Sequence, residues 1–454
     1  MEPIIQILAK ELDKKPEHVE NVVRLIDEGN TIPFIARYRK ELHGAMDDTA
    51  LRTLADRLQY LRNLDKRREE VKSAIEGQGK LTEELSAAID AAATLAEVED
   101  LYRPYKPKRR TRATVAREKG LEPLAQLLYA QEQDGPAPEE AAGDYVAAEK
   151  GVESVEDALQ GASDIIAEWI SDDADIRKGL RELVWRKGYL VSAAAAKEPE
   201  DTVYRLYYDF KSPLNRAMGH QVLAINRGER EEILKVSVEM DRETALIPIR
   251  RAVLRPGAPV MAFVRAAAED AYDRLIFPAL EREARSDLTE RADEGAIGQF
   301  ALNLKPLLMQ PPVKGKVTMG LDPGYRNGCK VAVVDGTGKV LDTAVVYPTF
   351  SEKKKQEAID VLARLIKKHG VAHIAIGNGT ASRETEQMAV KLIRQVNEAG
   401  AHVSYMIVSE AGASVYSASP LAAEEFPDYD VNLRSAVSIA RRLQDPLAEL
   451  VKID

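Results

Sequence analysis

Two carboxylates in the last third of the chain stand where a metal ion or a phosphate group could bind. Asp322 follows the short, mostly apolar run Val317–Leu321 and precedes Pro323-Gly324, and Glu410 follows the run Tyr405–Val408. An acid at the end of a buried strand, beside the backbone N–H groups of a glycine turn, suits a divalent cation or a phosphate. The pattern predicts the metal site of a metal-dependent nuclease, the phosphate site of an ATPase, or a turn that Asp322 merely caps.

A two-metal nuclease needs three or four carboxylates, because two Mg²⁺ ions must clamp the attacking and the leaving oxygen together. The third acid is expected at the start of the last helix, where Asp430 lies slightly early and Asn432 and Ser435 occupy the most useful turn. The catalytic candidates are therefore Asp322, Glu410 and Asp430, in an incomplete and vestigial set. We expect no required cofactor, and Mg²⁺ only if the nuclease alternative holds.

The ATPase alternative would use Gly377-Asn378-Gly379-Thr380 as a second phosphate loop. Residues 324–330 lack the Walker spacing. Actin-type ATPases also close ATP between two copies of the fold, and the chain after residue 315 is long enough for one. With one Cys and no His-Glu-x-x-His motif, a zinc site is not expected.

A basic stretch with two prolines lies near residue 105 and contains no acid. The prolines favour an extended loop rather than a helix. Such a loop predicts contacts to the phosphates of a nucleic acid, with Tyr102 and Tyr105 available for stacking on bases. The alternative is that its cations pair with acidic helices of the same protein. The six basic residues are Arg103, Lys106, Lys108, Arg109, Arg110 and Arg112.

Aromatic and basic residues also alternate in the stretch Phe34–Lys40. One interpretation is a helix that turns Phe34 and Tyr38 inward and leaves its charges in solvent.

Composition sets the wider limits. The chain has 454 residues, a net charge of −10 and 45% hydrophobic residues, which predicts two to four domains. It has no apolar run long enough for a membrane span and no basic start typical of a signal peptide. A single cysteine, Cys329, fits a reducing, cytoplasmic location. Because the whole chain is acidic, nucleic-acid binding must depend on local charge.

Hydrophobic periodicity gives the order of the elements. Helices are expected over residues 1–100, with one long helix at 51–75, and again over 162–196 and 267–302, before a Pro/Gly linker at 310–315. After it, three strands in a meander are followed by alternating helices and strands, which is the ribonuclease-H-like order. The strands are expected at 317–321, 329–334, 340–346, 373–376 and 404–408, and the helices at 353–369, 384–399 and 433–443.

Several motifs resemble one protein family and follow its order along the chain. They are Thr31–Lys40, Glu99–Lys106, Leu223–Glu229, Gly320–Gly324, Ile376–Glu386, Val408–Ser417 and Ala440–Leu447. Together they resemble the bacterial Tex transcription accessory proteins, and the last four resemble the YqgF-type domain of that family.

The resemblance implies a multidomain, mainly α protein with one α/β ribonuclease-H-like (YqgF) domain. It implies a helix-turn-helix-like N-terminal helical domain at 1–200, a central helical region at 201–312, a YqgF-like domain at 316–447 and, at 448–454, the start of a helix-hairpin-helix region. Since the family continues into such repeats and an OB-fold RNA-binding domain, we expect its principal nucleic-acid-binding module to be missing here.

The implied function is that of a scaffold that binds RNA and/or DNA and acts with the transcription machinery. RNA polymerase or ribosome components are the candidate protein partners, and no membrane is involved. A nuclease or resolvase acting through Asp322 and Glu410, and a platform that binds only proteins, remain the alternatives.

Overall fold

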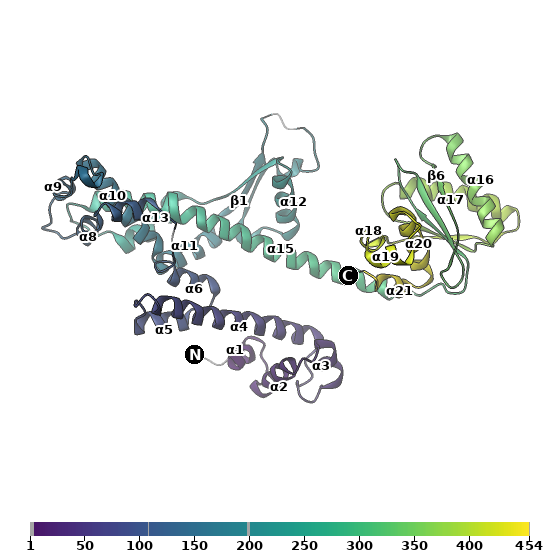
Figure 1. Cartoon of the computed structure of the whole chain (residues 1–454), viewed down its shortest axis with the longest axis horizontal. Helices are drawn as coiled ribbons and strands as arrows, with labels where there is room; N and C mark the ends of the chain where they lie inside the picture. The colour runs from purple at the N-terminus through teal and green to yellow at the C-terminus, as the bar shows by residue number, and fades with distance from the viewer. Residues whose placement is uncertain (1–3, 108, 198–199, 454) are drawn as a thin grey trace. The chain divides into compact units, whose positions relative to one another are not determined.

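The computed structural model describes residues 4–107, 109–197 and 200–453 (Figure 1). The chain divides into two compact units, Met1–Asp293 and Glu294–Asp454. Within the described ranges, no helix is long and apolar enough to cross a membrane.

The first unit begins with six helices that share one core. Leucines at helical spacing line the buried face of α4, which confirms the long helix expected at 51–75. The Asp47 side chain caps α4 by accepting a hydrogen bond from the Ala50 N–H at 2.7 Å. The helices are α1 (Ile4–Glu11), α2 (Pro16–Asp27), α3 (Ile32–Tyr38), α4 (Asp48–Glu76), α5 (Glu83–Ala91) and α6 (Leu95–Tyr102).

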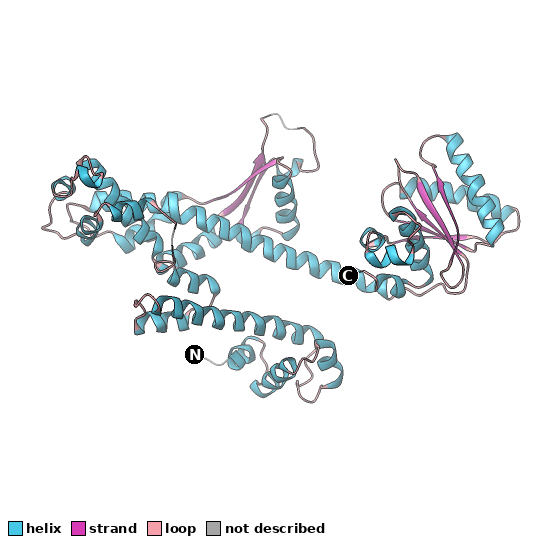
Figure 2. Cartoon of the chain, viewed as in Figure 1, coloured by secondary structure: helices cyan, strands magenta, loops and turns pink. Residues whose placement is uncertain are grey.

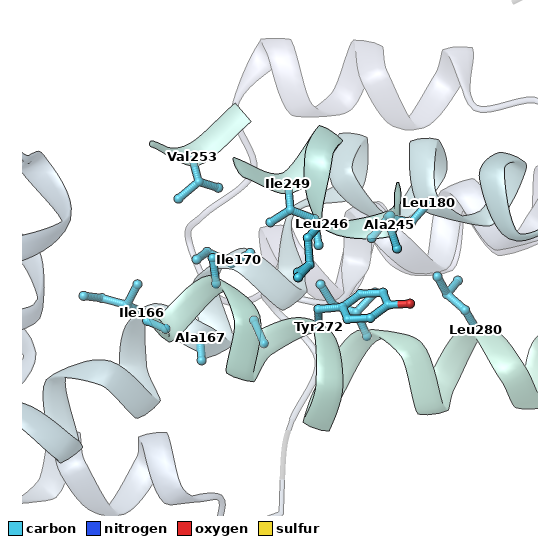
Figure 3. Close-up of a cluster of buried hydrophobic side chains, with 14 of the residues drawn as sticks. Ile166, Ala167, Ile170, Leu180, Ala245, Leu246, Ile249, Val253, Tyr272 and Leu280 are labelled. Atoms are coloured by element: carbon cyan, nitrogen blue, oxygen red, sulfur yellow. The ribbon is translucent and has the colours of Figure 1, made fainter. Parts of the chain in front are cut away.

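A second core in the same unit gathers around α10 (Val155–Asp172), whose isoleucines are buried against its neighbours. Figure 3 shows Ile170 of α10 close to Leu246 of α13 (Arg242–Val253). A π-helical segment, Ala271–Ile276, joins α14 to α15. The other helices are α7 (Arg112–Glu118), α8 (Glu122–Ala130), α9 (Pro138–Gly143), α11 (Ala174–Lys187), α12 (Gly219–Arg230), α13 (Arg242–Val253), α14 (Met261–Asp270) and α15 (Phe277–Leu308).

A three-stranded antiparallel sheet corrects the expectation that residues 162–196 and 201–312 are helical. Its strands are β1 (Tyr189–Ala194), β2 (Asp209–Pro213) and β3 (Leu234–Glu239), in the order β2-β1-β3. Burial in β3 alternates, with Leu234 and Val238 inside and their polar neighbours outside. This period of two is the signal for a strand, and the sequence interpretation missed it because the segments are short.

The second unit contains a five-stranded mixed sheet in the order β6-β5-β4-β7-β8 (Figure 2). The first three strands pair antiparallel, and β7 and β8 extend the sheet parallel to β4. This confirms the predicted ribonuclease-H-like order. The strands are β4 (Thr318–Asp322), β5 (Cys329–Val334), β6 (Val340–Val346), β7 (His373–Gly377) and β8 (Ser404–Val408).

Helices cover both faces of this sheet. The side chains of α16 (Glu352–His369) and α17 (Ser382–Glu398) form a core with one face, and α20 (Val431–Gln444) packs on the other. Three short helices accompany α20: α18 (Ala413–Ser417), α19 (Pro420–Glu425) and α21 (Pro446–Leu450).

Gly320 allows α20 to lie directly on β4. A Cβ at this position would overlap the carbonyl oxygen of Ala436 and come within 2.8 Å of the Ala440 nitrogen. Only glycine permits so close an approach of helix and strand. The contact brings the first turns of α20 next to the end of β4, where Asp322 lies.

Candidate functional site

Asp322 ends β4 and faces α20. It lies opposite Lys330 in the β4–β5 register, so both side chains project from the same face of the sheet. Lys330 is only 8% exposed, and its ammonium group donates a hydrogen bond to the carbonyl oxygen of Asn327. From α20, the Ser435 hydroxyl group lies near enough to the Asp322 carboxylate to lower its pKa. The corner is therefore a carboxylate between a hydroxyl group and a buried ammonium group.

The electrostatics of this corner disfavour the charged form of Asp322. Burial raises the pKa of Asp322 to about 6, and the nearby charge of Glu410 acts in the same direction. The hydroxyl group of Ser435 and the positive charge of Lys330 oppose the rise in pKa. The structure thus brings Asp322 and Glu410 close enough to interact, as the sequence predicted.

Glu410 is held beside the loop that follows β7. The side-chain oxygen of Asn378 accepts a hydrogen bond from the Glu410 N–H at 3.1 Å. A Cβ at Gly379 would overlap the Glu410 carboxylate, and one at Gly377 would lie 2.5 Å from it. The Glu410 carboxylate therefore fills the space over residues 377–380, and its negative charge would repel a phosphate in the loop that the ATPase alternative requires.

Arg442 supports the segment that carries Glu410. Its side chain reaches this segment from α20, and the residue is only 2% exposed. Its Nη1 donates hydrogen bonds to the carbonyl oxygens of Ser409 at 2.8 Å and Ala411 at 2.7 Å. These bonds fix the backbone on both sides of Glu410. Sequence reasoning missed this role, because it depends on where α20 crosses the sheet.

Asp430 is placed differently from Asp322 and Glu410. It is exposed, and its carboxylate caps α20 by accepting a hydrogen bond from the Leu433 N–H at 2.7 Å. Ser435 is the α20 residue that faces Asp322. Across the described parts of the chain, no three His, Cys, Asp or Glu side chains come together as metal ligands. Two carboxylates beside a buried ammonium group do not fit a pair of Mg²⁺ ions, which need several oxygen ligands and negative charge.

The basic stretch is a loop, as expected, between the end of α6 at Tyr102 and the start of α7 at Arg112. Three of its five predicted contact residues that the structure describes are already paired with acids. Arg109 and Arg112 are exposed and make no ion pair within the ranges that the structure describes, and Lys108 lies outside those ranges. The ion pairs are Arg103–Asp172 at 3.1 Å, Lys106–Glu99 at 3.5 Å and Arg110–Glu118 at 2.9 Å.

The two tyrosines near this loop do not project freely. Tyr102 and Tyr105 are half-buried against the N-terminal core, and the Arg67 guanidinium group lies 5.6 Å from the centre of the Tyr102 ring. The expected stacking surface is instead part of the core, because this is the largest apolar surface within reach of the rings. The loop therefore offers charge rather than aromatic rings.

A mixed sheet of this order, with helices on both faces and an acid at the end of its first strand, defines the second unit as a ribonuclease-H-like domain. Residues 316–444 match the Tex protein YqgF-like domain. Residues 133–300 match the Tex central region-like family, and residues 2–76 match the Tex-like protein N-terminal domain. The chain belongs to the Tex family.

Curated relatives are similar along almost the whole chain. The transcriptional accessory protein Tex of Neisseria gonorrhoeae is 46% identical over 99% of this chain and 59% of its own length. Protein tex of Bordetella pertussis is 45% identical over 99% of this chain and 58% of its own length. The human S1 RNA-binding domain-containing protein 1 is 37% identical over 99% of this chain and 46% of its own length. The chain spans about three fifths of the bacterial relatives it matches.

Proposed function

We propose that this chain acts in transcription as a scaffold that binds RNA or DNA and does not cleave it. Membership of the Tex family and the similarity to a protein named transcriptional accessory protein Tex support the role in transcription. The similarity to a protein named for an S1 RNA-binding domain supports a nucleic acid as the ligand. RNA polymerase or ribosome components are the protein partners that such a scaffold would serve.

The exposed cations of the basic loop carry the binding part of the proposal. Arg109 and Arg112 are exposed and make no ion pair in the described chain, so their charge is available to phosphate groups, although the charge of Arg112 also acts on the carboxylate of Asp164. In a chain with a net charge of −10, such a local cluster is the surface that would attract a polyanion. Arg103, Lys106 and Arg110 would contribute more weakly, because an acid already neutralises each of them.

The composition of the Asp322 corner supports the absence of cleavage. A catalytic metal pair would need a third carboxylate where Ser435 lies, and the buried Lys330 ammonium group would repel the cations. No cofactor is required in this proposal. A divalent-metal nuclease is the second candidate, because Asp322 and Glu410 do share one corner.

Titrations of the purified chain with fluorescent RNA and DNA oligonucleotides, single-stranded and duplex, would test the proposal. They should be made at several salt concentrations with Mg²⁺, and the probes examined for cuts. We expect salt-dependent binding, with no cleavage of any probe. The double variant Arg109→Glu/Arg112→Glu should bind at least tenfold more weakly and show a salt slope smaller by about two, because two phosphate contacts are lost.

The matched control reverses the charges of Lys391 and Arg394, which are exposed on α17 and make no ion pair within the described chain. The control should bind like the parent. Equal losses in both double variants, or none in either, would count against the basic loop. Mg²⁺- or Mn²⁺-dependent cleavage that disappears in Asp322→Asn would establish the nuclease instead.

A further inference from the structure

The end of α3 presents an aromatic ring to solvent. Tyr38 is 56% exposed, contrary to the expectation that it turns inward with Phe34. The short helix buries Ile35 completely and leaves Phe34 half-buried on its flank. The two rings touch, with centroids 5.3 Å apart and planes inclined at 50°. Phe34 thus packs against Tyr38, whose ring remains largely exposed.

Three cations, Arg37, Arg39 and Lys40, are close to this ring pair in the chain, and none of them makes an ion pair with another described residue. Arg37 and Lys40 are exposed. The Arg39 guanidinium group lies 5.2 Å from the centre of the Phe34 ring and donates a hydrogen bond to the carbonyl oxygen of Tyr38 at 3.0 Å. This group, Phe34, Arg37, Tyr38, Arg39 and Lys40, is called the α3 patch below.

A purely structural role explains only part of the α3 patch. Cations near the C-terminal end of a helix interact favourably with its dipole, which accounts for the charges. The helix dipole does not account for the large aromatic ring of Tyr38 in water. Its exposure costs free energy unless another molecule covers the ring. Acids outnumber basic residues in the chain, 74 to 64, yet these three neighbouring cations remain without an acid partner in its described part.

We propose that the α3 patch binds a single-stranded polynucleotide. The Tyr38 ring, supported by Phe34 and Arg39, stacks on an unpaired base, and Arg37 and Lys40 contact the flanking phosphates. This proposal rests on the proposed function, which makes a nucleic acid the ligand. It adds a second surface that contacts the nucleic acid, and it specifies that the bound strand is single.

The chemistry of the patch selects this ligand. An exposed aromatic ring bordered by cations matches a flat base attached to a charged backbone, and every base offers a face for stacking, so little sequence preference is expected. In a duplex the base faces are covered by their neighbours, so the ring would have nothing to stack on. A protein partner would call for a wider apolar surface than this one ring pair.

The test compares binding of a fluorescent single strand and of its duplex to the full chain. Tyr38→Leu removes the ring but keeps an apolar side chain, and Tyr38→Phe keeps the ring. We expect Tyr38→Leu to weaken single-strand binding about tenfold with an unchanged salt slope and to leave duplex binding unchanged. Tyr38→Phe should bind like the parent, and Arg37→Glu/Lys40→Glu should lower both the affinity and the salt slope for the single strand.

The strand should be tested as RNA and as DNA. A loss in Tyr38→Leu with either strand supports the proposal, and a loss with only one of them identifies that strand as the ligand. Unchanged single-strand binding by Tyr38→Leu, or equal losses for single strand and duplex, would overturn it. If the parent binds strands and only Arg109→Glu/Arg112→Glu loses affinity, the α3 site fails while the proposed function survives. If the parent binds no nucleic acid at any salt concentration, both fail.

Discussion

Replacing Asp322 by Asn should stabilise the second unit at neutral and alkaline pH. In the folded chain the pKa of Asp322 is about 6, against 3.8 when it is freely solvated. The folded state therefore binds the proton more tightly, and this contribution to stability is complete below pH 4 and is lost as the pH rises through 6. A pKa difference of about two corresponds to roughly 3 kcal/mol.

Asparagine has nearly the same size as aspartate and carries no charge. The substitution therefore removes the free-energy cost of burying a charged carboxylate at this position. It also gives up two favourable interactions of the charged carboxylate, with the ammonium group of Lys330 and with the hydroxyl group of Ser435. We therefore expect Asp322→Asn to raise the free energy of unfolding of the second unit by about 1–3 kcal/mol at pH 8. At pH 4, where the parent carboxyl is already protonated in the fold, the gain should vanish.

Amide hydrogen exchange on the full chain is the suitable assay. The only two tryptophans, Trp169 and Trp185, lie in the first unit, so their fluorescence does not report on the second. Protection of the β4 and β5 amides, corrected for the intrinsic pH dependence of exchange, gives the local free energy of unfolding.

Asp342 provides a control of opposite sign in the same unit. Hydrogen bonds from Lys368 at 2.8 Å and His369 at 2.9 Å lower the pKa of Asp342 to about 2. Its contribution to stability is present above pH 4 and is lost as the pH falls through 2, so Asp342→Asn should destabilise the unit at pH 8. Lower stability of Asp322→Asn at pH 8 would show that Lys330 and Ser435 outweigh burial, and the reasoning would fail.

Three further substitutions test other parts of the structure. Gly320→Ala should destabilise the second unit by about 3 kcal/mol in the same exchange assay, because its Cβ would overlap the Ala436 carbonyl group and the backbone cannot easily move. Arg177→Met should destabilise the first unit by about 2 kcal/mol, because it removes a 2.7 Å ion pair from the buried carboxylate of Asp100. Urea unfolding, followed by the fluorescence of the tryptophan on the same helix, measures this free energy of unfolding. Ser435→Asp adds a second negative charge beside the carboxylate that ends β4, so stability at pH 8 should fall and should recover with millimolar Mn²⁺, as amide exchange would show.

The alternation of elements in the second unit could be predicted because each one has a strong local pattern. All five strands and the helices α16, α17 and α20 lie within a few residues of their expected positions. The small sheet of the first unit could not be predicted in the same way. Its strands are short and separated by loops and helix α12, and they become strands only by pairing with partners far away in the sequence.

Some residues of the candidate site could likewise be predicted from the sequence, and others could not. The sequence alone determined that Asp322 and Glu410 each come at the end of a strand, because an acid after an apolar run is a local pattern, and β7 lies between these two strands in the sheet. Only the tertiary structure decided that Ser435 and Lys330 face Asp322, since this depends on the register of β5 and on the close approach of α20 at Gly320.

The aromatic and basic segments show the same limit. The sequence determined that cations cluster in the loop near residue 105 and at the end of α3. Whether a cation is free or paired, and whether a ring is buried or exposed, depends on residues distant in the chain, as Arg103 with Asp172 shows. Packing thus left Tyr102 and Tyr105 half-buried against the N-terminal core and left Tyr38 in solvent, because only the folded chain determines which apolar surface each ring can reach.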